Sequence, residues 1–224
     1  MSQQRTRGLL RGAIGAVLVW ATCPRAIAQP PNDNCDNAEA VSGAAVIPFF
    51  TLAATTDGPE PCGSLGADVW FYYDPIVSGS VRLSTCGGGT NFESVISAYR
   101  RTTCCDPNDC DLVGLLGCSG AAGGACAPGG STLRVPVNNR YRVLVQVGGH
   151  EGAQGEGELA LTPCVGDFDA DGVVALADLA LLLSEFGECG IVACRYDIEP
   201  PGGDGDVDLT DLAVVLSRFG TECP

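Results

Sequence analysis

The C-terminal quarter of the chain contains a duplicated acidic segment. A shift of 33 residues aligns DGVVALADLALLLSEFG (171–187) with DGDVDLTDLAVVLSRFG (204–220), and 11 of the 17 positions are identical. Upstream, a shift of 30 maps Cys164 onto Cys194 and Asp167 onto Asp197, so the second copy contains three extra residues. This agreement indicates the internal duplication of a unit made of one loop and one helix.

Oxygen-bearing side chains in the first copy have the spacing of an EF-hand calcium loop. Counted from Asp167, carboxylates occupy positions 1, 3, 5 and 12, and Gly172 occupies position 6, where the chain must turn sharply. Calcium takes roughly six to eight hard oxygen ligands, and alternating residues in a tight loop direct such oxygens inward. The predicted ligands are Asp167, Asp169, Asp171, Val173 through its backbone carbonyl, and Asp178.

The second copy offers a similar set of oxygens, with its insertion between positions 3 and 5. Position 9 is an aspartate here, whereas the first loop has Ala175 and is expected to use a water molecule. We therefore expect two Ca²⁺ sites, the second weaker because of the insertion. The predicted ligands are Asp197, Glu199, Asp204, Asp206 through its backbone carbonyl, Asp208 and Asp211.

The alternative is a pair of solvated acidic turns without a metal ion. Two carboxylates about 4 Å apart repel each other by roughly 4 kcal/mol at an effective dielectric constant of about 20. Four carboxylates in one compact loop would cost about as much as the whole stability of a small domain. Bridging of the carboxylates by a cation is therefore the preferred hypothesis.

One helix is expected after each loop, and no helical pattern precedes either loop. Gly187 and Gly220 are expected to end the two helices. Apolar residues at helical spacing predict one apolar face in each copy: Leu176, Leu179, Ala180, Leu183 and Phe186 in the first, and Leu209, Leu212, Ala213, Leu216 and Phe219 in the second.

A duplicated loop–helix unit without entering helices resembles the dockerin type I module, over about residues 164–221. The resemblance implies a small calcium-dependent helical fold and a cohesin domain as partner. Where this family often has Ser-Thr in contact with cohesin, the chain has Leu176-Ala177 and Leu209-Thr210. This departure concerns the choice of partner and leaves the calcium ligands unchanged.

The N-terminus has the features of a secretory signal peptide. Arg5, Arg7 and Arg11 precede the short apolar run AIGAVLVWA (13–21), and Ala26-Ile27-Ala28 matches a cleavage site. The apolar run is too short to span a bilayer, and no other segment comes close. We therefore expect export, cleavage near Ala28 and a secreted, periplasmic or cell-surface protein.

The cysteine count agrees with export. Of the 13 cysteines, Cys23 lies in the signal peptide, and the remaining even number favours disulfides over zinc ligands. Two pairings are open for the last four cysteines. Pairing within each repeat, Cys164–Cys189 and Cys194–Cys223, is favoured over Cys164–Cys223 with Cys189–Cys194.

Charge excludes two classes of partner. Without the four arginines of the signal peptide, the chain has eight basic and 27 acidic residues, which gives a net charge of −19. The chain has no lysine. Such a surface repels nucleic acids and anionic lipids and attracts cations. Twelve of the acidic residues lie between Asp167 and Asp211, inside the duplicated segment.

Residues 29–163 are expected to form a disulfide-rich β-sandwich or jelly roll. Short strands separated by Gly, Pro and Asn turns are predicted at 68–75, 80–86, 93–100, 131–137, 140–149 and 157–163. The order SGSVRLSTCGG, NFESVISAYR and YRVLVQVGG…GEGELALTPC resembles bacterial pre-peptidase C-terminal domains over about residues 68–164. The resemblance implies an accessory domain of a secreted protein, and some such domains bind matrix or polysaccharide.

The expected organisation is a signal peptide (1–28), a β-sandwich (29–163) and a dockerin-like module (164–224). No catalytic residue is predicted, since His150 has no nucleophile motif beside it and nothing in the sequence pairs Asp68 with Glu93. The expected function is non-catalytic: the tail attaches to a cohesin-like or cell-surface protein, and the sandwich binds an extracellular ligand such as a polysaccharide. The alternatives are a polysaccharide-degrading or accessory protein delivered by the tail, and a purely structural envelope protein.

Overall fold

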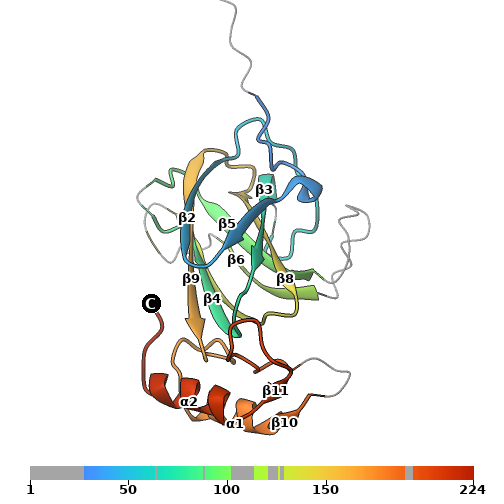
Figure 1. Cartoon of the computed structure of the whole chain (residues 1–224). Coiled ribbons are helices and arrows are strands. Elements are labelled where there is room, and N and C mark those ends of the chain that lie inside the picture. The colour runs from blue at the N-terminus through green and yellow to red at the C-terminus, as the bar shows by residue number, and fades with distance from the viewer. Residues whose placement is uncertain are drawn as a thin grey trace, which may run out of the picture.

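The computed structural model describes residues 28–63, 65–87, 89–101, 114–120, 126, 129–189 and 194–224. Two sheets face each other, and two short helices lie beyond one end of the sheets (Figure 1). The expectation of a mainly β chain containing a sandwich is confirmed. The predicted signal peptide lies outside the described residues except for Ala28.

The larger sheet has five strands in the order β1-β3-β8-β5-β6. A 3₁₀ helix, η1 (Cys35–Asn37), precedes it, β1 pairs parallel with β3, and the other neighbours are antiparallel. The strands are β1 (Glu39–Ser42), β3 (Leu65–Asp74), β5 (Ser94–Arg101), β6 (Leu115–Ser119) and β8 (Arg142–His150).

The second sheet has four antiparallel strands in the order β2-β9-β4-β7. These strands are β2 (Ala45–Phe50), β4 (Gly79–Ser84), β7 (Thr132–Val137) and β9 (Glu156–Val165). All six segments predicted as strands contain one. The three sandwich strands without a prediction, β1, β2 and β6, lie at sheet edges, where side chains are partly exposed and the apolar alternation is weak.

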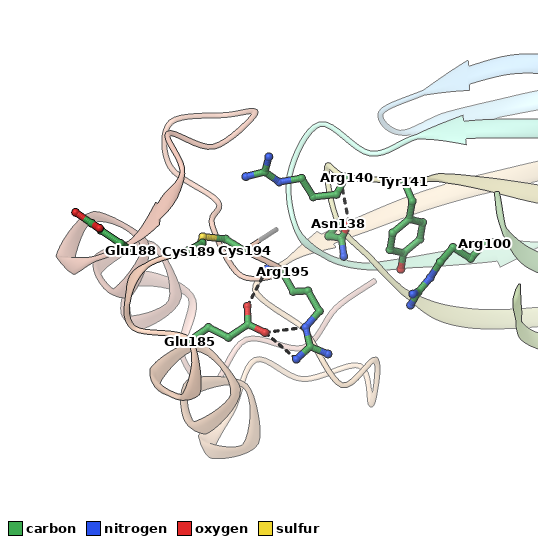
Figure 2. A pocket seen from close by; sticks show the side chains of 9 residues that line it. All are labelled: Arg100, Asn138, Arg140, Tyr141, Glu185, Glu188, Cys189, Cys194 and Arg195. Carbon is green, nitrogen blue, oxygen red and sulfur yellow. Dashed lines mark hydrogen bonds and ion pairs between the residues drawn. A yellow bond between two sulfur atoms is a disulfide. The ribbon is translucent and has the colours of Figure 1, made fainter. Parts of the chain in front are cut away.

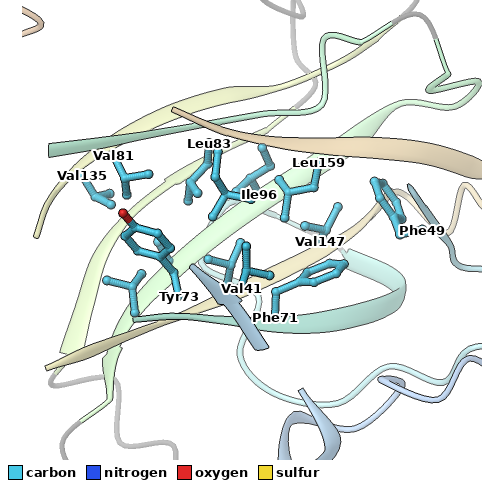
Figure 3. Packing of buried hydrophobic residues seen from close by; sticks show 14 of the residues in the cluster. Val41, Phe49, Phe71, Tyr73, Val81, Leu83, Ile96, Val135, Val147 and Leu159 are labelled. Carbon is cyan, nitrogen blue, oxygen red and sulfur yellow. The ribbon is translucent and has the colours of Figure 1, made fainter. Parts of the chain in front are cut away.

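The inward residues of the two sheets form the main core (Figure 3). Alternate residues of each strand point inward, so Val81 and Leu83 of β4 pack against residues such as Phe71, Ile96 and Val147 of the other sheet. Val81, Leu83, Ile96 and Val147 are fully buried. Burying each such side chain stabilises the fold by about 1.5–3 kcal/mol.

Four disulfides are present among the described residues. Cys62–Cys118 and Cys86–Cys126 lie in the sandwich, while Cys164–Cys223 and Cys189–Cys194 lie in the C-terminal part. This number of crosslinks indicates an extracellular protein, because cytosolic thiols are kept reduced. Cys104, Cys105 and Cys110 lie outside the described residues.

The C-terminal tail, residues 164–224, has its own buried cluster. It includes Phe168, Val174, Leu182, Val207 and Val215, and it is separate from the sandwich core. Helix α1 (Leu176–Ser184) contacts α2 (Leu209–Arg218), and both lie at the end of the molecule away from the sandwich (Figure 1). None of the helices in the described ranges is long and apolar enough to cross a bilayer.

The two halves of the tail pair reciprocally. Strand β11 (Asp206–Val207) in the second loop pairs with β10 (Gly187–Glu188), which follows α1. At the equivalent place in the first loop, Val173 forms a bridge with Glu222, which follows α2. Each loop is therefore closed by the segment that follows the other loop's helix.

This reciprocal pairing explains why the favoured disulfide prediction is wrong. Cys164 begins the first repeat and bonds Cys223 at the end of the second, and Cys189 bonds Cys194 across the junction. The prediction assumed that each repeat closes on itself. In the structure the end of one repeat lies beside the start of the other, which brings the other pairs of sulfur atoms together.

The helices also differ from the prediction in length and in orientation. Helix α1 ends at Ser184, and Gly187 lies in β10 instead of capping the helix, whereas Gly220 follows the C-cap of α2 with a φ of +80°. The buried helical residues are Asp178 and Leu182 in α1 and Asp211 and Val215 in α2. Much of the predicted apolar face therefore points to solvent.

Candidate metal centre

The first acidic loop begins where β9 leaves the sandwich. Strand β9 ends at Val165, and Gly166, with a φ of +90°, turns the chain into Asp167. Asp167, Asp169 and Asp171 each offer one carboxylate oxygen, and these three oxygens lie within 4.8 Å of one another. Three of the five predicted ligands of the first loop are thus brought together.

Backbone N–H groups hold the carboxylates of this loop in place. The N–H of Asp171 donates to Asp169 Oδ1 at 3.1 Å, and the N–H of Val173 donates to Asp171 Oδ1 at 2.8 Å. These Asx turns leave the second oxygen of each carboxylate for another partner. Val173, predicted to act through its carbonyl, lies in the bridge to Glu222.

Asp178 closes the loop from the first turn of α1. Its Oδ1 accepts from the N–H of Phe168 at 2.6 Å and of Asp169 at 3.3 Å, and its Oδ2 accepts from the N–H of Ala175 at 2.8 Å. The carboxylate is fully buried. The structure therefore places this predicted ligand in the loop, where it fixes the backbone on both sides.

The side chain of Asp167 is also fully buried, at 0% exposed. Its Oδ2 accepts a hydrogen bond from Ser80 Oγ at 2.6 Å and lies 3.6 Å from Arg134 Nη1. Its Oδ1 is buried and has no hydrogen-bond partner among the described residues. A buried acceptor without a partner costs about 1–3 kcal/mol, so this atom marks a place where a cation would stabilise the protein.

These residues fit a calcium ion. The donors are hard carboxylate oxygens converging in one loop, and one of these carboxylates, Asp167, has a buried oxygen that lacks a partner among the described residues. Desolvation raises the pKa of Asp169 above its ordinary value, and the charges of Asp178, Asp171 and Asp167 add to the increase. The second effect shows that the carboxylates repel one another. A divalent cation between them would relieve this repulsion.

The second loop holds its first aspartate differently. Both oxygens of Asp197 accept backbone N–H groups, Oδ1 from Asp204 at 3.3 Å and Oδ2 from Gly205 at 2.9 Å. Burial raises the pKa of the Asp197 carboxyl, and these two donors oppose the increase. Within the described residues of this loop, no three carboxylates converge as they do in the first loop.

The remaining predicted ligands of the second loop are spread along it. Asp204 accepts the N–H of Asp206 at 3.1 Å, while Glu199 is exposed. Asp208 is the N-cap of α2, and the hydroxyl and N–H of Thr210 lower the pKa of its carboxyl. Asp211 accepts from Ile198 N, Glu199 N and Asp208 N, as Asp178 does at the equivalent position.

Sequence reasoning missed the two sandwich residues that contact Asp167. Ser80 lies in β4 and Arg134 in β7, 87 and 33 residues away in sequence. An isolated serine and an isolated arginine in predicted strands give no sequence signal of such a role. Only the arrangement of β4, β7 and β9 in one sheet brings them to the loop.

A cleft of about 460 Å³, lined mostly by charged and polar residues, lies between the sandwich and the tail (Figure 2). The tail side carries Glu185 and Arg195, which form an ion pair at 2.7 Å. On the sandwich side the guanidinium of Arg100 lies over the Tyr141 ring, 4.6 Å from its centroid. Arg140, at the rim, lies 3.5 Å from Asp197 Oδ2.

The two carboxylates considered for polysaccharide cleavage have different surroundings. Asp68 is fully buried, and its carboxylate accepts hydrogen bonds from Gln146 Nε2 and from the backbone N–H of Asp57. Burial raises its pKa to about 7. The side chain of Glu93 is 60% exposed and lies 3.7 Å from His150 Nδ1.

Comparisons with known proteins show a likeness in structure. No protein-family model and no curated protein sequence matches the chain. The structure is similar to that of the pre-peptidase C-terminal domain of a collagenase from Bacillus anthracis, with 8% sequence identity and a TM-score of 0.36. The similarity covers 55% of this chain and 93% of that domain.

Proposed function

We propose that this chain is a secreted, non-catalytic calcium-binding protein that attaches to another extracellular protein through its tail. The observation that carries the docking role is a repeated pattern of exposed apolar side chains. Two leucines of α1 and a phenylalanine just after it are exposed. The three equivalent residues of α2 and the segment after it are exposed too. The pairs are Leu176 and Leu209 (72% and 70% exposed), Leu183 and Leu216 (49% and 52%), and Phe186 and Phe219 (46% and 44%).

This exposed face supports docking because solvent-exposed leucines and phenylalanines are unfavourable unless another surface covers them. Larger exposed apolar patches mark interaction sites in soluble proteins. Leu176 and Leu209 also stand at the positions that contact cohesin in dockerin type I modules, which the tail resembles in sequence. We propose an apolar contact there in place of the Ser-Thr contact common in that family, with a cohesin-like domain as the partner.

The proposed role of calcium is to hold the loops that carry the two helices. The first loop is the stronger candidate, because three carboxylates converge there and one of them, Asp167, has a buried oxygen without a partner among the described residues. We propose that the second loop binds a second ion more weakly, because both oxygens of Asp197 are already hydrogen-bonded. Bound calcium would supply the positive charge that the crowded carboxylates need.

For the sandwich we propose an extracellular ligand of polysaccharide type, bound in the cleft next to Tyr141. The Tyr141 ring has the Arg100 guanidinium over one face, and together with Asn138 these side chains offer such a ligand an aromatic surface with hydrogen-bonding groups beside it. Ligand sites commonly combine an apolar surface with a few polar groups in a cleft between structural units. Tyr141→Ala should weaken retention on a polysaccharide that the wild-type protein binds.

The docking proposal is tested with immobilised cohesin domains and the full chain. Retention is expected in calcium, loss in chelator, and loss in Leu176→Asp/Leu209→Asp. Val46→Asp is the control, because Val46 is a similarly exposed apolar residue (64% exposed) that lies in the sandwich and not on the tail helices. Absence of calcium-dependent retention on every cohesin domain tested would refute docking to this class of partner.

A further inference from the structure

The outer face of the four-stranded sheet contains an unusual buried serine. In β4, Val81 and Leu83 point into the sandwich core, so Ser80 points to the opposite, outer face. Outer positions of an antiparallel sheet normally face water. Ser80 is nevertheless only 1% exposed, because the start of the tail covers it.

Arg134 determines where the hydroxyl proton of Ser80 points. Its Nη1 donates to Ser80 Oγ at 3.1 Å, and an arginine can only donate. The single proton of the serine is therefore free to go to Asp167 Oδ2, 2.6 Å away. Arg134 Nη2 also donates to the backbone oxygens of Cys223 and Pro224, at 3.2 and 3.1 Å, which fixes the guanidinium itself.

The two sandwich residues together fix the rotation of the Asp167 carboxylate. One oxygen, Oδ2, is held by the hydroxyl of Ser80 and the charge of Arg134. The other, Oδ1, remains buried without a partner, in the loop where oxygens of Asp169 and Asp171 converge. A ligand held in this way needs no rearrangement when a cation arrives.

We infer that Ser80 and Arg134 are positioning residues of the cation site in the first loop, so that the site is built jointly by the sandwich and the tail. This inference rests on the proposed binding of calcium. Groups that hydrogen-bond a metal ligand from outside typically change metal affinity by about 10–100-fold when they are removed. Calcium in the first loop would accordingly also stabilise the contact between the tail and the sheet.

The second loop provides an internal comparison. Asp197 also has a sandwich arginine nearby, Arg140, at 3.5 Å. Its two oxygens, however, are held by N–H groups of its own loop, from Asp204 and Gly205. Positioning by the sandwich is therefore specific to the first loop, and substitutions at Ser80 should leave the weaker site unchanged.

The test is calcium titration of the full chain by isothermal calorimetry, which separates a tighter from a weaker site. Ser80→Ala should weaken the tighter site about tenfold and leave the weaker site within twofold of the wild type. Ser78→Ala is the matched control, because Ser78 is also buried and its carbonyl accepts the N–H of Gly166 at the start of the loop, but its hydroxyl has no partner among the described residues. This control should bind like the wild type.

A second pair of variants separates the effect of losing the hydroxyl from the effect of changing the side-chain volume. Ser80→Thr keeps the hydroxyl and Ser80→Val replaces it with a methyl group of similar size. Ser80→Thr should bind calcium like the wild type, and Ser80→Val should show the same loss of affinity as Ser80→Ala. Near-ultraviolet circular dichroism in chelator checks that each variant is folded.

The outcomes separate the two proposals. Wild-type affinity at both sites in folded Ser80→Ala or Ser80→Val would overturn the positioning role while calcium binding stands. An equal loss in Ser80→Thr and Ser80→Val would also overturn it, because the hydroxyl would not be the cause. Absence of calcium binding by the wild type would overturn the calcium proposal, and the positioning role with it.

Discussion

Cys164 and Cys223 form a disulfide that joins the first residue of the tail to its penultimate one. Their Cα atoms are 5.7 Å apart across a sequence separation of 59 residues. Both sulfur atoms lie within 4.8 Å of a carboxylate oxygen of Asp167. The covalent closure of the tail and the candidate metal centre are therefore parts of one small region.

We expect this disulfide to stabilise the chain more than Cys189–Cys194. In the chain-entropy description, closing about 60 residues contributes about 4 kcal/mol, and closing about 6 contributes about 2 kcal/mol. Urea unfolding of the double variants Cys164→Ala/Cys223→Ala and Cys189→Ala/Cys194→Ala measures the two effects. A larger loss from the second pair would contradict this ranking.

Asp167→Asn should remove most of the stabilisation that calcium gives. For one site at an ion concentration about 100 times Kd, the wild type should gain about 2.7 kcal/mol over the protein in chelator. The asparagine variant keeps the shape of the side chain but loses the charge. Thermal unfolding at several calcium concentrations measures the gain.

The control for this experiment is Asp36→Asn, because Asp36 is an exposed carboxylate of the sandwich. It should keep the full calcium response. Asp197→Asn should lose only a smaller part, because the second loop is the weaker candidate. An Asp167→Asn protein with the wild-type response would show that the ion binds elsewhere.

The leucines of the two helices should separate into two classes. Leu176 and Leu209 are mostly exposed, so Leu176→Asp/Leu209→Asp should change the free energy of unfolding by less than about 1 kcal/mol. Leu182 is fully buried, and Leu182→Ala should cost about 2–5 kcal/mol. Denaturant unfolding measures both. A large loss in the aspartate variant would mean that these leucines pack within the protein.

Asp68 should make the sandwich less stable as the pH rises from about 4 to about 7. Its pKa is raised from 3.8 to about 7 by burial, so the folded state retains a proton that the unfolded chain has already lost in this range. The stabilisation is complete below pH 4 and is lost as the pH passes through 7. The whole change amounts to at most about 4 kcal/mol.

The slope of stability with pH, measured by urea unfolding, tests this prediction in Asp68→Asn. The variant cannot titrate at this position, so its profile should be flatter than that of the wild type between pH 4 and 7. Asp36→Asn should keep the wild-type slope. Equal slopes in wild type and Asp68→Asn would show that the buried carboxyl is not responsible.

Strands with two neighbours in a sheet were predictable from local pattern, and three of the four edge strands were not. Strands β3, β4, β5, β8 and β9 bury alternate or consecutive side chains, which leaves a clear apolar pattern bounded by turn residues. Among the edge strands, only β7 has such a pattern. The others, β1, β2 and β6, keep exposed positions and in β2 include Pro48, features tolerated at a sheet edge.

The disulfide pairing in the tail could not be obtained from cysteine spacing. Spacing treats each repeat as a closed unit, whereas each loop pairs with the segment after the other repeat's helix. The apolar face of the helices was likewise predicted from a local pattern, the periodicity of apolar residues, and the structure leaves much of that face exposed. Periodicity identifies an apolar face but cannot say whether the protein itself covers it.

The sequence by itself determined the duplication, the positions of the carboxylates in each loop, and the apolar patterns of the six predicted strands. These are local properties, because residue spacing along a loop, helix or strand decides them. Only the tertiary structure decided that Ser80 and Arg134 meet Asp167, that Asp197 is held within its own loop, and that Leu176 and Leu209 face solvent. Those relationships depend on how β4, β7 and β9 assemble and on where the tail lies against them, and contacts between residues so far apart in sequence have no local pattern.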